Sequence, residues 1–382
     1  MAIKSGLAAQ LGISDETTYG TPVTVSRFFP FVSEGVKTDI ARIEAKAILA
    51  GRRTLDSSQW VPGDVKVGGQ IQFELLDHTM GIWLRHAFGG YTVSGSNPYT
   101  QTYTPGDLTG KSFTVQVGRP SVGTGVVQPF TYSGCKVSKW QIACQAGQIA
   151  TAAFDVVGQD EITSRVVTDG VTTSGSATLT SATAYFTSMD IGSPISGTGI
   201  PSTTTILSVQ STTSVTLSAN ATATATAVSV TVGVALATAS YSTVNPVSYV
   251  SGSLSVAGST VPVKQFTISG DNKLDESRRF VGSQLVSEPL EMDRRDYSID
   301  FDPEFTDMAL YQRFLNGQMG SLVVVLASGA NTYTFTMNVR FDGETPKVSG
   351  TKIVENPIKA VAVGTTDSAA ITVVTVNADA AY

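Results

Sequence analysis

The chain has 382 residues and a formal net charge of −6, and charged residues make up only 15% of it. This length exceeds one ordinary domain core, and the scarcity of charge beside abundant Gly, Ser, Thr, Ala and Val predicts two or three units of mainly β structure. The acidic balance, without a cluster of Lys and Arg, excludes a protein that holds nucleic acid by neutralising its phosphates.

The N-terminal region shows no sign of a targeting segment. Residues 1–16 lack the apolar centre of a secretory signal, and no stretch approaches the roughly 20 apolar residues that a membrane helix needs. We therefore expect a soluble protein made in a cytoplasm, with no membrane insertion. Two cysteines, Cys135 and Cys144, are too few for a disulfide framework and are expected to be buried free thiols.

Residues 38–62, "TDIARIEAKAILAGRRTLDSSQWVP", mix charged with aliphatic side chains between two expected strands. This pattern favours a long hairpin or loop that projects from the body of the protein. A solvated local hairpin or a short helix is the alternative. The charged residues of the segment are Asp39, Arg42, Glu44, Lys46, Arg52, Arg53 and Asp56.

Residues 71–89, "IQFELLDHTMGIWLRHAFG", and residues 299–317, "IDFDPEFTDMALYQRFLNG", share Ile, Phe, Met, Arg and Gly in register. Each copy begins with the alternation of a strand, continues with the apolar spacing of a short helix, and ends on a glycine suited to a left-handed stop. In the second copy, Thr306 is the expected helix N-cap. The repeat and helix-packing positions are Ile71, Phe73, Met80, Trp83 and Arg85, and then Ile299, Phe301, Met308, Tyr311 and Arg313.

The resemblance between the two halves extends beyond this segment. "RRTLDSSQWVP" from residue 52 resembles "RRFVGSQLVSEP" from residue 278, and "SGCKVSKWQI" from residue 133 resembles "SGTKIVENPI" from residue 349. Three blocks in the same order predict one duplicated unit. The alternative is two unrelated strand–helix units of similar composition.

The segment between the halves has a different composition. Residues 166–263 contain no Lys, Arg or Glu, and β-branched residues alternate there with small polar ones. A disordered Ser/Thr-rich linker is one explanation. The periodic aliphatic residues instead favour a compact inserted β domain of about 80 residues with its own core.

The sequence offers little support for catalysis, for a metal or for a cofactor. His78 and His86 are the only histidines and lie at the two ends of a predicted helix, so they are not expected to meet at one metal. "GDLTGKS" at residues 106–112 has one residue too few for a phosphate-binding loop and leads into a strand, so a β-turn is expected. The acidic cluster of Asp300, Asp302, Glu304 and Asp307 lacks the pattern of a calcium-binding loop.

The order of "LAAQLGISDETTYGTPV", "RFFPFVSEGVK", "GRRTL" and "GGQIQFEL" with its helix resembles the major tail tube proteins of long-tailed bacteriophages. The resemblance covers both flanks, and the middle segment is similar to the small β modules that decorate phage tail proteins. It implies a mainly β fold of duplicated tail-tube β-barrel or sandwich units, each with a short flanking helix, and a small inserted all-β domain. The implied boundaries are residues 1–165, 166–244 and 245–382, with the insert on the tube exterior.

In that family, subunits form rings that stack into a hollow tube. The resemblance implies a structural virion protein of the tail, assembled in the bacterial host cytoplasm, that is not an enzyme and needs no cofactor. Its implied partners are further copies of itself, in a hexamer or in a trimer of duplicated subunits, the tape-measure protein, and the tail terminator and distal tail proteins.

The resemblance also gives roles to particular residues. The charged residues of segment 38–62 would contact the neighbouring ring, and Glu74, Asp300 and Asp302 would face the lumen, where acidic groups let DNA pass without specific binding. An extracellular or virion-surface β-sandwich adhesion protein that binds host carbohydrate is the alternative function. Clustered exposed aromatic residues would support adhesion, but Tyr185 and Phe186 are both expected in the core of the insert.

Overall fold

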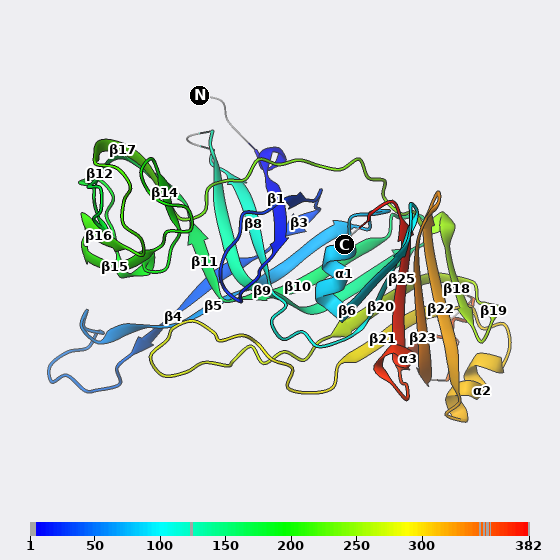
Figure 1. The fold of residues 1–382 in the computed structure, drawn as a ribbon. Helices are drawn as coiled ribbons and strands as arrows, with labels where there is room; N and C mark the ends of the chain where they lie inside the picture. Colours follow the sequence, from blue (N-terminus) through cyan, green and yellow to red (C-terminus); the bar gives the residue numbers. More distant parts are fainter. Residues whose placement is uncertain are drawn as a thin grey trace.

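The computed structural model of the protein describes residues 5–122, 125–343, 345–346, 348, 351 and 353–380. Within them, 19 strands are hydrogen-bonded into one continuous system, and six further strands form a separate sheet. Figure 1 shows the separate sheet at one end of the molecule and the last strands of the chain at the other. The mainly β fold expected from the composition is therefore confirmed.

The first half of the chain forms two β layers around one helix. The elements are η1 (Gly6–Ala8), β1 (Gln10–Asp15), β2 (Arg27–Phe28), β3 (Ser33–Glu34), β4 (Lys37–Glu44), β5 (Trp60–Glu74), α1 (Gly81–Phe88), β6 (Gly89–Gly95), β7 (Tyr99–Pro105), β8 (Phe113–Pro120), β9 (Val127–Gln145), β10 (Thr151–Gly158) and β11 (Asp160–Thr163). The long strand β9 belongs to both layers, because its first part pairs with β8 and β11 and its last part pairs with β10.

The second half begins after a connector that follows the separate sheet. Its elements are η3 (Tyr249–Ser251), β18 (Gly252–Val256), β19 (Ser259–Thr260), β20 (Val263–Asp271), β21 (Asp296–Pro303), α2 (Ala309–Leu315), β22 (Met319–Ser328), β23 (Asn331–Gly343), β24 (Ile358–Ala362), α3 (Asp367–Ala370) and β25 (Ile371–Asn377).

The main strand pairings of the two halves correspond, although the β3–β5 pairing of the first half has no counterpart among the described residues of the second. β9 pairs with β8 on one side and with β11 and β10 on the other. From β10 the sheet continues to β5 and then to β4. β23 likewise joins β22, β25 and β24, and the pairs continue to β21 and β20. Ile71 pairs with Phe154 of β10 as its counterpart Ile299 pairs with Ala360 of β24. The first half contains the β6–β7 hairpin in addition.

One pair of sequence blocks does not correspond in the structure. The block from residue 133 lies in β9, whose structural counterpart is β23, whereas the block from residue 349 follows β23 and leads into β24. Residues 349, 350 and 352 of that block lie outside the described residues. The block from residue 278 does match, because it connects β20 to β21 as the block from residue 52 connects β4 to β5.

The separate sheet has its own core. It consists of β12 (Arg165–Thr172), β13 (Thr178–Thr180), β14 (Ile195–Gly197), β15 (Ile206–Ser211), β16 (Ser214–Leu217) and β17 (Ala225–Val232), with η2 (Ser188–Asp190). Phe186 is buried in this core, but Tyr185 is exposed and is not a core residue as expected. Tyr185 has a positive φ of 50°, so the backbone turns at this residue, and only Phe186 enters the core.

The two repeat helices begin and end alike but are buried differently. Each ends before a glycine with positive φ, Gly89 or Gly317, as expected. Thr306 is not the N-cap of α2, since Met308 has that position and the Asp307 carboxylate accepts a hydrogen bond from the Ala309 amide. Seven of the eight residues of α1 are buried, whereas none of α2 is.

Candidate assembly surfaces

A single sheet crosses both halves of the chain. In it the order is β4, β5, β10, β9, β20, β21, β24 and β23, and the β9–β20 pairing runs from Gln145 opposite Gln265 to Lys139 opposite Asp271. We refer to these eight strands as the central sheet and to β9–β20 as the inter-half pairing. One layer of the first half thus continues without interruption into the second.

The two edge strands of the central sheet are the counterparts of the two strands that form the inter-half pairing. β4 at one end is the counterpart of β20, and the last part of β23 at the other end is the counterpart of the last part of β9. Within the described residues, β4 pairs only with β5, and Phe341–Gly343 pair only with β24. Open strand edges of this kind are templates for pairing with another chain.

One face of the central sheet is polar. Partners in antiparallel strands point to the same face, so the register defines a row across seven strands: Glu74, Thr151, Ala143, Thr267, Asp300, Lys359 and Asp342. Two of the three residues predicted to face a lumen, Glu74 and Asp300, lie in this row. The third, Asp302, lies two residues further along β21 on the same face. The opposite face, with Phe73, Ile142 and Ile268, is buried in the core.

Acidic groups outnumber basic groups on this polar face. The acids are Asp39, Glu74, Asp155, Asp271, Asp296, Asp300, Asp302 and Asp342, and the bases are Lys37, Lys66, Lys139, Lys359 and Arg340. Lys273 Nζ lies 3.1 Å from the Asp271 carboxylate and 2.7 Å from that of Asp296. Burial by itself raises the pKa of Asp271, but hydrogen bonds from Lys273 and the charge of Lys139 outweigh it and lower the pKa. The Asp271 carboxylate thus keeps its charge and adds to the excess of acids on this face.

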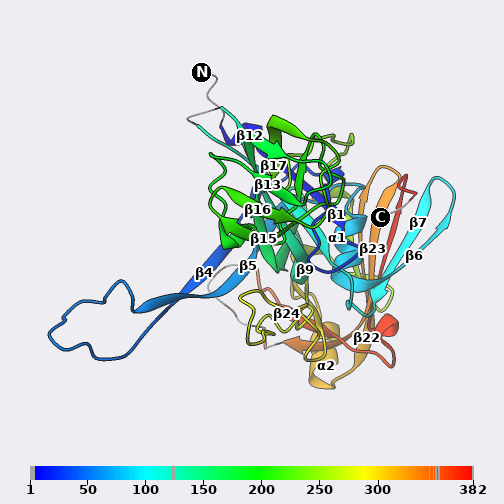
Figure 2. The ribbon, with the colours of Figure 1, turned by 60° about the vertical axis from the view of Figure 1, so that its left-hand side comes forward.

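Residues 38–62 lie in a β4–β5 hairpin that projects far from the body of the protein (Figure 2). Asp39, Arg42 and Glu44 lie on β4, and Lys46, Arg52, Arg53 and Asp56 lie in the connecting loop. Arg42 stacks over the ring of Trp60 at 5.6 Å, and Arg52 forms an ion pair with Asp56. Several aliphatic side chains are exposed here, and Ile48 is 98% exposed. Contact of these residues with another ring stays a prediction.

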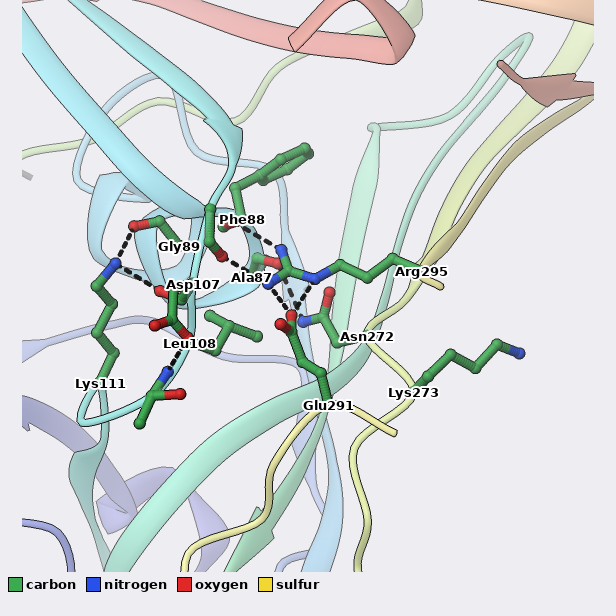
Figure 3. A network of polar contacts seen from close by, with 12 residues as sticks. Ala87, Phe88, Gly89, Asp107, Leu108, Lys111, Asn272, Lys273, Glu291 and Arg295 are labelled. Carbon is green, nitrogen blue, oxygen red and sulfur yellow. Dashed lines mark hydrogen bonds and ion pairs between the residues drawn. The ribbon is translucent and has the colours of Figure 1, made fainter. Parts of the chain in front are cut away.

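The loop of residues 272–295, which we call the inter-half loop, leaves the second half and crosses the first. Asn272 is fully buried, and its Nδ2 donates hydrogen bonds to the carbonyl oxygens of Ala87 and Val137. Arg295 donates to the carbonyl oxygens of Phe88 and Gly106, as Figure 3 shows. The contacts to Ala87 and Phe88 satisfy carbonyls at the C-terminal end of α1, which have no partner within the helix.

A buried ion pair fixes the same loop. Lys136 Nζ lies 2.6 Å from Glu288 Oε1 and also donates to the carbonyl oxygens of Leu108 and Pro289. Burial lowers the pKa of Lys136, and the hydrogen bond to Glu288 opposes that shift. Sequence reasoning did not identify these residues. The only available signal was a lysine between Cys135 and Val137, two positions that alternation would not mark as exposed.

The residues considered for chemistry have structural contacts instead. His86 Nε2 lies 2.6 Å from Asp15, and burial lowers the pKa of His86. Lys111 Nζ donates to the carbonyl oxygens of Gly89 and Asp107 (Figure 3), so the "GDLTGKS" segment is a turn that binds its own backbone. Among the described residues, no group of three or more His, Cys, Asp or Glu side chains could hold a metal ion. No helix in that part of the chain is long and apolar enough to cross a membrane.

The repeat positions have different surroundings in the two halves. Trp83 is fully buried, and its ring lies between those of Phe73 and Phe154 of the central sheet and Phe113 of β8. Its counterpart Tyr311 is only partly buried. Ile71 and Phe73 are buried like Ile299 and Phe301, but Met80 is buried whereas Met308 is 47% exposed. Arg85 forms an ion pair with Asp15, while Arg313 is part of α2, of which only Leu310 and Phe314 pack against the core.

Comparison with known families gives two matches along the chain. The family model described as phage tail tube protein matches residues 6–204 and again residues 203–363. The two matches agree with the duplication seen in the strand pairings. No curated protein matches the chain.

Proposed function

Since the chain belongs to the phage tail tube protein family and contains two tandem units of it, we propose that copies join head to tail into rings that stack into a hollow phage tail tube. The observation that carries this proposal is the central sheet. Its free ends, β4 and the last part of β23, have the counterparts β20 and β9, which already pair inside the chain. A contact between β23 of one copy and β4 of the next therefore repeats a geometry that this sequence forms.

Such a head-to-tail contact is heterologous, and it closes into a ring when the rotation between units divides a full turn. Each chain supplies two units, so three chains give six units and six chains give twelve. Closure removes every open edge of the central sheet, as in a barrel. The ring number is an outcome of the experiment below.

The polar face of the central sheet lines the channel in this proposal, since its other face is occupied by the core. Asp300 and Asp302 of one half and Glu74 of the other then repel DNA phosphates, and the Gln, Ser and Thr side chains around them offer no cluster of positive charge. DNA passes without specific binding. The insert follows β11, which belongs to the other layer, and we place it on the tube exterior.

Electron microscopy of the purified protein tests the assembly. We expect hollow polymers of stacked rings, and a density map in which β4 of one copy adjoins β23 of the next. Rings joined through other strands, or a protein that stays monomeric at high concentration, would contradict the proposal. Mass spectrometry of single rings gives the ring number.

The lumen assignment has a separate test in virions. Reversing the charge of Asp300 and Glu74 with lysine places two cations per chain in one row of the channel wall, which should slow genome ejection. Raising the salt concentration should restore the rate, because screening weakens phosphate contacts. The neutral variants D300N and E74Q serve as controls. Ejection at the normal rate in the lysine variant would mean that this face does not line the channel.

A further inference from the structure

Two exposed apolar surfaces lie on opposite sides of the molecule. One is the tip of the β4–β5 hairpin, residues 45–59, with exposed Ile48, Leu49 and Leu55. The other surrounds α2, where Leu315 is 58% exposed and Met319 62%. Figure 1 shows the hairpin and α2 on opposite sides of the molecule, so they cannot meet within one chain. Exposed apolar surface of this kind marks contact sites between proteins.

The two surfaces carry opposite charge. The hairpin tip contains Lys46, Arg52 and Arg53 but only one acid, Asp56. The turn that leads into α2 contains Glu304 and Asp307, and Glu355 lies beside Glu304. Lys264 Nζ is 3.6 Å from Glu304 and 2.7 Å from Glu355, so three acids accompany one lysine before α2 begins. Opposite charge on two contacting surfaces guides association and fixes the partner.

The chain also contains an internal example of the contact. The inter-half loop connects β20 to β21 as the hairpin connects β4 to β5, so the two segments are counterparts. The inter-half loop extends over the unit on the far side of the inter-half pairing. There its Gln284 carbonyl accepts a hydrogen bond from the Val65 amide, and its Asn272 and Arg295 bind the C-terminal end of α1.

We propose that the hairpin tip of one copy docks against α2 of the neighbouring copy in the same ring. This inference rests on the proposed function, because it requires the head-to-tail contact of β23 with β4. That contact places the hairpin beside the neighbour's second half, as the inter-half loop is placed beside the first half. Leu315 and Asn316, the counterparts of Ala87 and Phe88, end α2, and no described side chain donates to their carbonyl oxygens.

A reciprocal charge exchange tests the partner. K46E with R53E puts negative charge on the hairpin tip opposite the acids near α2, and polymer formation should be lost while the circular dichroism spectrum of the monomer is unchanged. Adding E304K and D307K should restore the polymers. A mismatched control combines K46E and R53E with D293K, which lies on the exposed part of the inter-half loop. This variant should not form polymers. Normal assembly of the hairpin variant, or failure of the exchange to restore assembly, would overturn the inference.

Cross-linking distinguishes a contact within a ring from a contact between rings. In assembled polymers of the I48C, L315C double variant, a flexible bismaleimide should link each copy to two neighbours of the same ring. A denaturing gel should then show a ladder that ends at the ring number, while each single variant and the wild type, whose cysteines are buried, should show no ladder. A ladder without an end would place the hairpin on the next ring, and no ladder would exclude the contact. In both cases polymers by microscopy would leave the proposed function intact.

Discussion

Replacing Trp83 and its repeat counterpart Tyr311 by alanine should have very different costs. Trp83 is fully buried, and its ring centroid lies 5.2 Å from that of Phe73, 5.0 Å from Phe154 and 5.7 Å from Phe113. Tyr311 lies on a helix that has no buried residue, and its hydroxyl is 3.1 Å from that of Thr345. The same position of one duplicated unit is therefore a core residue in one half and a surface residue in the other.

The expected loss of unfolding free energy depends on what each aromatic side chain contacts. Truncation of a buried Trp costs about 3–5 kcal/mol, because the apolar surface is lost and the cavity collapses only in part. Trp83 also loses several aromatic contacts, each contributing about 0.5–1.5 kcal/mol. We therefore expect W83A near the upper end, about 5 kcal/mol, and Y311A below about 1 kcal/mol, as for surface substitutions.

Hydrogen exchange resolved by peptide is the appropriate measurement, because the separate sheet has its own core and the chain need not unfold in one step. Peptides of β5 and β10 should lose protection in W83A and keep it in Y311A, with peptides of β12 to β17 as an internal reference in both. Equal losses in the two variants would refute the reasoning. So would a loss in W83A that is as large in the separate sheet as in β5.

Three further predictions concern the inter-half pairing, a buried carboxylate and the insert. A Cβ at Gly270 would lie 2.4 Å from the Trp140 ring, so G270A should cost about 1–3 kcal/mol in urea denaturation, and W140L should remove most of that cost in the double variant. Burial raises the pKa of Asp77, but hydrogen bonds from Asn245, His78 and Asn331 outweigh it and lower the pKa. The charged Asp77 carboxylate therefore stabilises the fold fully above its unfolded-state pKa, near 4, and this stabilisation is lost as the pH falls through the lower folded-state pKa. D77N should lower the free energy of unfolding by about 1–3 kcal/mol at pH 7 and should not change it in strong acid, as measured by denaturation at both pH values. Deleting residues 165–232 should leave the circular dichroism melting of the remaining chain and its polymers in micrographs nearly unchanged, because the two ends of the deleted segment lie together at Thr163 and Gly233.

Each of these predictions has an outcome that contradicts it. An unchanged cost of G270A in the W140L background would show that the clash lies elsewhere. A constant difference between D77N and wild type at all pH values would mean that the carboxylate charge of Asp77 has no stabilising role. Loss of folding on deletion would show that the insert core supports the central sheet.

The sequence predicted the repeated elements well where local chemistry decides the structure. Strand alternation from Ile71 and Ile299, the helices that follow and the glycines at 89 and 317 all appear as expected. Alternation, helical spacing and positive φ are properties of a few neighbouring residues, so they can be read from a short window. The polar face with Glu74, Asp300 and Asp302 follows from the same alternation.

The sequence could not predict features that depend on distant segments. Asn272, Lys136 and Arg295 connect the halves through contacts whose partners lie far away in the chain, and nothing around them marks the partner. The different burial of α1 and α2 also depends on what covers each helix and not on its own residues, which share a pattern. Two blocks of similar letters, from residues 133 and 349, have no common place in the fold.

Duplication gives this chain a property that a single unit lacks. In a ring of separate identical units, every contact between neighbouring units, which we call a joint, is made by the same residues. Each of those residues must therefore suit all the joints of the ring. Here one joint is inside the chain, and it has acquired a buried lysine–glutamate pair and a fully buried asparagine that would be costly to desolvate if left without partners. The Lys136 ammonium and the Asn272 Nδ2 have partners whenever the chain folds, and Asn272 Oδ1 is left without one among the described residues. The hairpin and α2, which we propose to meet at the other joint, keep exposed charges and aliphatic groups that water tolerates before assembly. The difference between the two joints is what we expect if, as we propose, one joint forms during folding and the other forms only between chains.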